Sequence, residues 1–308
     1  MTQLNSSPAS PSDLYTRIGQ FYDASSLLWE QVWGEHMHHG YYGPAGNLRK
    51  ERYQAQVDLM DALLQWGNVQ TATSILDVGC GIGGSTLYLA QRFKANAVGI
   101  TLSPVQARRA AERAQAKGLS KEDEQPGGLA EGTTEERMSA RFQVANALET
   151  GFPNSTFDLV WSLESGEHMP DKRQFLQECY RQLKPGGHFL MATWCHRATD
   201  SLAGALTADE QRHLQAIYDV YCLPYVISLP EYGAIAADIG FRNIQTADWS
   251  TAVAPFWDEV IRSALAPSVT LKLLQAGRST IQGALSLGLM SSGFRRGLIR
   301  FGLLRATK

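Results

Sequence analysis

Short apolar runs alternate with amphipathic segments through the middle of the chain. The runs that predict buried strands are residues 75–78, 97–100, 142–145, 157–161 and 188–194. The segments whose apolar spacing predicts helices are residues 84–93, 104–116 and 171–183. Because strands that alternate with helices form βαβ units, the pattern predicts an α/β protein with a mostly parallel sheet.

The segments on either side of this core have mainly helical patterns of apolar positions, which predict a helical cap. Asp13 is a candidate N-cap for a first helix through Tyr22, and a second helix is expected at about 48–66. Later helices are expected at 207–221 and 230–239, and strands at 243–249 and 298–306. The predicted units are a disordered leader at 1–12, an N-terminal helical cap at 13–70, a core at 71–197, and a substrate cap with closing strands at 198–308.

Residues 118–139 read GLSKEDEQPGGLAEGTTEERMS, and this polar, glycine-containing stretch predicts a surface insertion in the core. The chain starts MTQLNSSPASPSD, with neither the apolar segment of a signal peptide nor the arginines of a transit peptide. Four cysteines form no CxxC pair, and the histidine spacing shows no metal site, which indicates reduced thiols. These features favour a cytoplasmic or stromal location.

Charge is distributed unevenly along the chain. The net charge is −2, so the whole chain lacks the basic signature of a nucleic-acid-binding protein. Residues 262–308, however, carry eight Lys or Arg and no acidic residue. We therefore expect peripheral contact with an anionic membrane through 271–300, with a solvated basic helix as the alternative. No apolar run reaches the roughly 18 residues of a membrane-spanning helix.

A glycine-rich turn between a strand and a helix gives the sharpest chemical signal. Residues 75–84 read ILDVGCGIGG, with an acidic residue two positions before the first glycine. A dehydrogenase would instead show GxGxxG for a pyrophosphate. S-adenosylmethionine carries an ammonium and a carboxylate, which prefer an acid and backbone amides respectively. The stretch resembles motif I of class I methyltransferases, and its candidate cofactor contacts are Asp77, Gly79, Cys80, Gly81 and Gly83.

Two further strand ends supply candidate cofactor contacts. After the second strand, Thr101 and Leu102 stand where many such enzymes have an acid for the ribose, and Gln106 is expected to help. A surface position for Gln106 is the alternative. After the third strand, Asn146 matches the position that binds the adenine amino group, and Ala147 would offer its backbone N–H.

The fourth strand leads into WSLESGEHMP at residues 161–170. Ligands of open α/β sheets bind outside the carboxyl ends of the strands, so this stretch should line the pocket. Glu164 and His168 are candidates to accept a proton or bind a hydroxyl, and Ser162 is placed on the cofactor side. Glu167 has a weaker case and could instead orient the loop. Aromatic faces suit a sulfonium, and the candidates are Tyr15, Tyr22, Trp33, Tyr41 and Tyr42.

Several strings together closely resemble the γ-tocopherol methyltransferases. They are WEQVWGEHMHHGYY at 29–42, the motif I run, residues 161–170, ATWCHR at 192–197 and LQAIYDVYCLPY at 214–225. The resemblance implies a Rossmann-like class I methyltransferase fold, with a seven-stranded sheet, an antiparallel last strand and a helical cap. It also implies S-adenosylmethionine as cofactor, a ring carbon of an amphipathic prenylated phenol as methyl acceptor, and work at thylakoid or plastid-type membranes.

The mechanism expected from this resemblance needs a base for the phenolic proton, and Glu164, His39 and His168 are the candidates. The prenyl tail needs an apolar trench, whose wall candidates are Tyr225, Leu229, Tyr232, Phe256 and Trp257; these could equally be ordinary core. The motifs do not separate a tocopherol from a phytylbenzoquinol, a sterol or an alkaloid nitrogen as acceptor. A dehydrogenase and a non-catalytic binding module are further alternatives.

Overall fold

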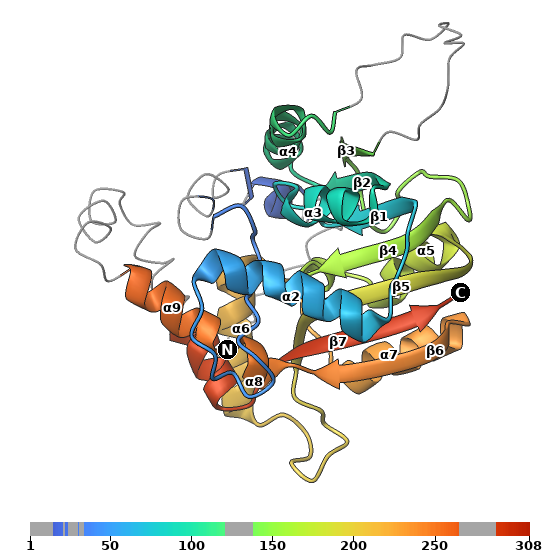
Figure 1. The fold of residues 1–308 in the computed structure, drawn as a ribbon. Coiled ribbons are helices and arrows are strands. Elements are labelled where there is room, and N and C mark those ends of the chain that lie inside the picture. Colours follow the sequence, from blue (N-terminus) through green and yellow to red (C-terminus); the bar gives the residue numbers. More distant parts are fainter. Residues whose placement is uncertain (1–14, 21, 24–29, 31–33, 121–137, 265–287) are drawn as a thin grey trace, which may run out of the picture.

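The computed structural model describes residues 15–20, 22, 23, 30, 34–120, 138–264 and 288–308. In this part of the chain, strands form one sheet of order β3-β2-β1-β4-β5-β7-β6 (Figure 1). Neighbours from β3 to β5 are parallel, and β7 is antiparallel to both β5 and β6. The strands are β1 (Ser74–Val78), β2 (Asn96–Thr101), β3 (Ser139–Val144), β4 (Phe157–Leu163), β5 (Leu183–His196), β6 (Arg242–Asp248) and β7 (Ile299–Thr307). The predicted sheet, with its antiparallel last strand, is confirmed.

Helices cover both faces of the sheet (Figure 1). Those with bounds inside the described residues are α2 (Arg52–Gly67), α3 (Gly84–Phe93), α4 (Pro104–Ala116), α5 (Lys172–Gln182), α6 (Ala208–Tyr221), α7 (Leu229–Ile239), α8 (Ser250–Val253) and α9 (Pro255–Ala264), with a 3₁₀ turn η1 (Gly166–His168). Residues 15–20, 22, 23 and 288–295 are helical as well. Local chemistry sets several starts: Ser103 caps α4 by accepting from the Gln106 amide, and Asp171 caps α5 in the same way. Helices α3 and α4 have their predicted bounds.

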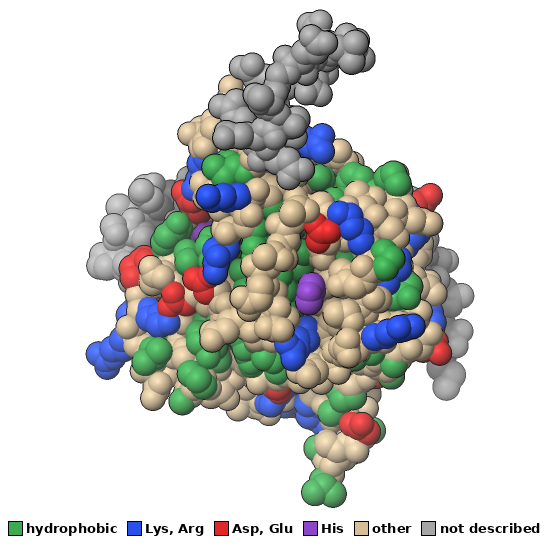
Figure 2. All heavy atoms as spheres, turned by 45° about the vertical axis from the view of Figure 1, so that its right-hand side comes forward, with side chains coloured by type: hydrophobic (Ala, Val, Ile, Leu, Met, Phe, Trp, Pro, Cys, Tyr) green, Lys and Arg blue, Asp and Glu red, His purple; other side chains and the backbone are tan. Residues whose placement is uncertain are grey.

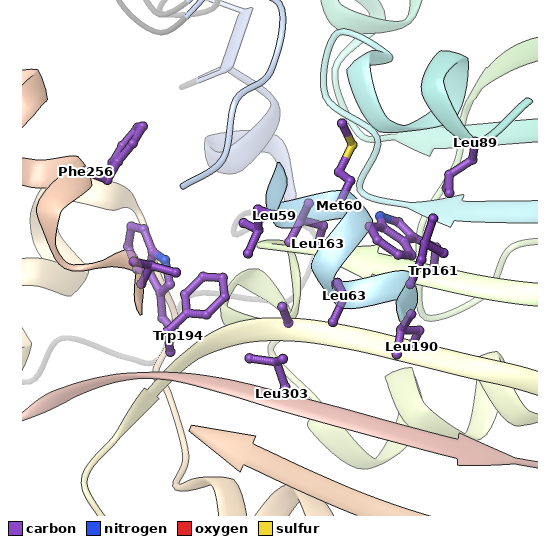
Figure 3. Close-up of a cluster of buried hydrophobic side chains, with 14 of the residues drawn as sticks. Leu59, Met60, Leu63, Leu89, Trp161, Leu163, Leu190, Trp194, Phe256 and Leu303 are labelled. Carbon is purple, nitrogen blue, oxygen red and sulfur yellow. The ribbon is translucent and has the colours of Figure 1, made fainter. Parts of the chain in front are cut away.

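Alternate residues of each central strand face opposite helical layers. Ile75 and Leu190 belong to a core cluster with α2, α3 and α6, whereas Leu76 and Phe189 belong to a second cluster with α5 and α7. In the first cluster, Leu59, Met60 and Leu63 of α2 lie over Trp161 and Leu190 of the sheet, while Trp194 and Phe256 close its other end (Figure 3). The sheet is therefore buried on both faces, which explains its nearly continuous apolar runs.

Two elements begin at other residues than predicted, one for a local reason and one because of strand pairing. Helix α2 begins at Arg52 rather than near Leu48, because a turn at 43–46 precedes it and the Glu51 side chain accepts from the Gln54 amide. Strand β5 begins five residues before the predicted start, since Leu183 already pairs with Phe157 of β4.

Some predictions fall partly outside the described residues. Asp13 and positions 121–137 of the proposed insertion lie there, as do residues 265–287 of the basic segment. In the described part of that segment, Met290, Phe294 and Leu298 are buried in the core. The described helices include none that is both long and apolar enough to cross a membrane. On the face in Figure 2, basic and acidic side chains are interspersed, without a patch of one sign.

Candidate active site

One cavity lies at the carboxyl ends of β1, β2 and β4, beneath the N-terminal segment 35–38. It also reaches the turn after β3 and the start of α3, so it joins every strand end that the motifs single out. The predicted residues that line it are Tyr15, Tyr22, Asp77, Gly79, Cys80, Gly81, Thr101, Leu102, Gln106, Asn146, Ala147, Glu164, Glu167 and His168. The topology thus brings together side chains that are up to 153 residues apart in sequence, from Tyr15 to His168.

Asp77, near the end of β1, is placed to bind a cation. Asp77 is 1% exposed, and Thr86 Oγ1 donates to its Oδ2 at 2.6 Å. Burial raises the pKa of Asp77 to about 7, because this hydrogen bond only partly compensates for lost hydration. An ammonium group bound beside Asp77 would stabilise the carboxylate again.

The loop after Asp77 holds its backbone close to the neighbouring loop. The amides of Gly79 and Cys80 both donate to Ile100 O at 2.9 Å, which fastens the turn to β2. Gly79 has φ +82°, and a Cβ there would lie 2.2 Å from Ser165 Cβ. Only glycine fits this position, and the backbone of Gly79 lines the cavity.

At the second and third strand ends, side-chain hydrogen bonds hold the predicted cofactor residues at the cavity. Thr101 Oγ1 donates to Gln106 Oε1 at 2.8 Å, and Gln106 is 3% exposed, so its predicted alternative as a surface residue is wrong. Asn146 Oδ1 accepts from the Leu148 amide at 3.0 Å, which fixes the side chain at the cavity wall. The Ser103 hydroxyl accepts from the Gln106 amide, and sequence reasoning missed this residue because it looks like a simple cap.

Three predicted site residues lie behind the lining. A Cβ at Gly83 would approach Phe142 Cζ to 2.7 Å, so this glycine permits packing of α3. Ser162 is fully buried, and its Oγ lies 2.8 Å from Ser165 Oγ, which donates to Val78 O. His39 is also fully buried and does not line the cavity.

The Glu164 carboxylate holds the N-terminal segment in place. Its Oε1 accepts from the His39 amide at 2.7 Å, and its Oε2 accepts from His39 Nδ1 at 2.7 Å and Trp194 Nε1 at 3.2 Å. Burial opposes ionisation of Glu164, but the adjacent His39 outweighs it and lowers the pKa of the carboxyl group. Glu164 adopts φ +54°, a strained backbone for this residue type that the surrounding contacts maintain.

A second polar pair spans the cavity from the N-terminal helix to η1. Tyr22 Oη and His168 Nε2 are 2.7 Å apart. Burial lowers the pKa of His168 to about 3, so its imidazole is neutral near pH 7. Lys172 Nζ donates to the carbonyl oxygens of Gly166, Glu167 and Met169 at 2.7–3.0 Å, and thereby anchors the turn that carries His168.

Two histidines that sequence reasoning did not select line the same cavity. His36 and His38 are each 4% exposed, and Gln56 Nε2 donates to their backbone oxygens at 2.6 and 2.9 Å. The signal that could have found them is the string GEHMHHG itself, in which residues 36 and 38 share one side of an extended segment.

The predicted trench walls do not line the cavity. Tyr232, Phe256 and Trp257 are fully buried in the core, Leu229 packs against it, and Tyr225 is 39% exposed. For all of them except Tyr225, the alternative interpretation as core residues is correct. Of the aromatic candidates, Tyr41 and Tyr42 also pack in the core, and Trp33 lies outside the described residues.

This fold and this strand-end site define a class I S-adenosylmethionine-dependent methyltransferase. The chain matches the family described as "Methyltransferase domain" over residues 76–191 and "Mycolic acid cyclopropane synthetase" over residues 10–126. It also resembles the geranyl diphosphate C-methyltransferase of Streptomyces coelicolor A3(2), solved with S-adenosyl-L-homocysteine, with a TM-score of 0.70 and 19% identity over 98% of this chain and 99% of that one.

Relatives in sequence are more specific. The chain is 41% identical to the tocopherol O-methyltransferase, chloroplastic, of Arabidopsis thaliana, over 94% of this chain and 81% of the relative. It is 44% identical to the probable tocopherol O-methyltransferase, chloroplastic, of Oryza sativa subsp. japonica, over 97% and 79%. It is 32% identical to the 2-methyl-6-phytyl-1,4-hydroquinone methyltransferase of Synechocystis sp., over 99% and 89%. The chain belongs to the tocopherol O-methyltransferase family.

Proposed function

We propose that this chain transfers the methyl group of S-adenosylmethionine to the ring carbon ortho to the hydroxyl of a prenylated phenol. The proposed substrates are γ-tocopherol, which becomes α-tocopherol, and δ-tocopherol, which becomes β-tocopherol. Family membership supports this proposal, since three relatives at 32–44% identity are named for tocopherols or a phytylated hydroquinone. The observation that carries it is the cavity that joins the Asp77 loop to His38 and His168.

The cofactor side of the cavity fits this methyl donor. Asp77 would hold the α-ammonium, and the backbone of Gly79 to Gly81 gives the amino-acid end room to approach. Thr101 and Gln106 would bind the ribose hydroxyls, and Asn146 with the Ala147 amide would bind the adenine. When bound, S-adenosylmethionine supplies a methyl group already activated on a sulfonium sulfur.

The protein's own residues must then align the ring and make its carbon nucleophilic. Removing the phenolic proton places negative charge on the ortho carbon. The polar residues Tyr22, His38 and His168 line the cavity, while Ile18, Leu163 and Met169 provide apolar wall. This mixture suits a ring that is apolar except at one hydroxyl.

A labelled methyl assay with γ-tocopherol tests the proposal. Carbon and oxygen methylation give products of equal mass, so NMR must show loss of the aromatic proton and retention of the phenolic hydroxyl. α-Tocopherol is the matched control, because it keeps the hydroxyl but lacks a free ortho carbon. Turnover of α-tocopherol would indicate oxygen transfer, and turnover of 2-methyl-6-phytyl-1,4-hydroquinone alone would assign a different acceptor.

We further propose peripheral membrane contact through 271–300 and a plastid-type location. The absence of acidic residues over 262–308 and the chloroplastic relatives support this. Because Met290 and Phe294 are buried, the contact would depend on basic side chains such as Arg295, which is exposed. Replacing Lys272, Arg278 and Arg295 by Gln should weaken binding to anionic vesicles, and unchanged binding would contradict this proposal.

A further inference from the structure

The three residues expected to act as base are each engaged elsewhere. Three donors occupy the oxygens of Glu164, so its carboxylate already has its hydrogen bonds within the protein. His39 lies behind the lining, with its ring 4.9–5.6 Å from those of Phe256, Trp257 and Phe294. His168 Nε2 already bonds the Tyr22 hydroxyl. Glu164 and His39 are therefore poorly placed to take the phenolic proton, and His168 keeps only Nδ1 for it.

His38 has the tautomer and the location that the role requires. Its Nδ1 lies 2.8 Å from His39 O, and because a carbonyl oxygen can only accept, Nδ1 carries the hydrogen. Nε2 therefore presents a lone pair. This atom is buried and has no hydrogen-bond partner among the described residues, in a side chain that lines the cavity. A buried acceptor of this kind needs a donor, and the substrate hydroxyl is one.

We propose that His38 Nε2 is the general base that accepts the phenolic proton, a role that rests on the proposed function. The O–H bond breaks, an N–H bond forms at Nε2, and the electron pair of the O–H bond stays with the ring system. The ortho carbon then forms a bond to the methyl group, while the electrons of the methyl–sulfur bond return to the sulfonium sulfur and neutralise it.

Restoring the aromatic ring completes the proton balance. The methylated carbon loses its proton to water, the ring regains aromaticity, and the imidazolium of His38 returns its proton to the phenolic oxygen. One proton is released for each methyl transferred, and His38 ends neutral.

Glu164 and His39 act as positioning residues for this base. The carboxylate fixes His39 through two hydrogen bonds, His39 O fixes the His38 tautomer, and Gln56 holds the His38 carbonyl. Burial lowers the pKa of His38 and keeps it neutral, while Glu164 opposes this effect and favours the transient imidazolium. The other titratable groups beside the ring are the imidazoles of His36 and His39.

The test compares wild-type protein with His38→Asn, whose amide can keep the bond to His39 O but lacks Nε2. With γ-tocopherol, kcat at pH 7 should fall by about 10²- to 10⁴-fold, the usual contribution of a general base. The remaining rate should rise tenfold per pH unit toward the phenol pKa of about 10, because only ionised substrate then reacts. Imidazole should restore rate to His38→Ala.

Controls separate this role from others. His36→Asn is the matched variant, since His36 has the same burial and the same cavity, and imidazole should not restore its companion His36→Ala. Binding of S-adenosylhomocysteine to His38→Asn should stay within threefold of wild type. A large loss of that binding, or a rate that imidazole and alkali do not restore, would overturn the proposal. The proposal would also be overturned if His168→Asn, and not His38→Asn, recovered its rate at alkaline pH. Absence of wild-type turnover on any prenylated phenol would refute the proposed function itself.

Discussion

Asp77 should make cofactor binding depend on pH in a defined direction. Asp77 is 1% exposed and accepts a hydrogen bond from Thr86 Oγ1, and burial raises the pKa of its carboxyl group from 3.8 to about 7. This difference in pKa corresponds to roughly 4 kcal/mol in favour of the neutral acid. Binding an ammonium beside it must return the group to its charged form.

The sign follows from this difference. Below pH 7 the ligand-free protein holds a proton on Asp77, whereas the complex favours the carboxylate, so binding releases a proton. The affinity for S-adenosylhomocysteine should therefore rise by up to tenfold per pH unit, about 100-fold from pH 5 to 7, and then level off. The histidines of the cavity do not interfere, because burial lowers the pKa of His36 to about 2 and of His168 to about 3.

Calorimetry in two buffers of different ionisation enthalpy measures both the affinity and the released proton. Asp77→Asn should bind more weakly and lose the dependence on pH. Glu167→Gln is the matched control, because Glu167 lines the same cavity and burial raises its pKa to about 7 as well; it should keep the wild-type slope. Constant wild-type affinity from pH 5 to 7, or an unchanged slope in Asp77→Asn, would refute the reasoning.

Further predictions concern the loop, the buried lysine and the buried ion pair. Gly79→Ala should lower S-adenosylhomocysteine affinity at least tenfold in calorimetry, whereas Gly151→Ala, with φ +77° and open space, should not; equal affinities would contradict the close approach. Burial lowers the pKa of Lys172 from 10.5 to about 7, so between these values the unfolded chain binds more protons than the folded protein. The free energy of unfolding, measured with denaturant, should therefore rise from pH 7 to 9. Lys172→Met should lose that rise, and an unchanged slope would contradict it. His39→Leu should lower the free energy of unfolding by about 3 kcal/mol, because it leaves the Glu164 charge buried without its partner; a loss below about 0.5 kcal/mol would show that the pair is not structural.

The sequence predicted the core of the fold because its signals there are local. Helices α3 and α4 follow from apolar spacing, a capping Ser103 and a proline at the first turn. The central strands are buried on both faces and therefore appear as apolar runs. The start of β5 was missed because its first residues are Leu-Lys-Pro-Gly-Gly, which suggest a turn; their pairing with β4 and the chain end is a tertiary effect.

The site was predictable as far as strand ends determine it. Asp77, Thr101, Asn146 and Glu164 each lie at or just after the carboxyl end of a strand, and parallel strands bring these ends to one edge. Which of these side chains remains free for chemistry depends on segments that return from elsewhere. Glu164 looks like a base in sequence, but His39, 125 residues away, takes its oxygens.

The segment 36–39 shows why a short string can serve two purposes. His36 and His38 line the cavity. His39 packs against the aromatic rings of the core and bonds the segment to Glu164. Because neighbouring side chains of an extended segment point to opposite sides, one residue of shift would exchange the base for the anchor. The anchor must therefore be the stronger contact: two hydrogen bonds from His39 to one buried carboxylate fix the register, and the register sets the His38 tautomer. Accurate placement of the proposed base thus follows from the stability of a neighbour that never meets the substrate.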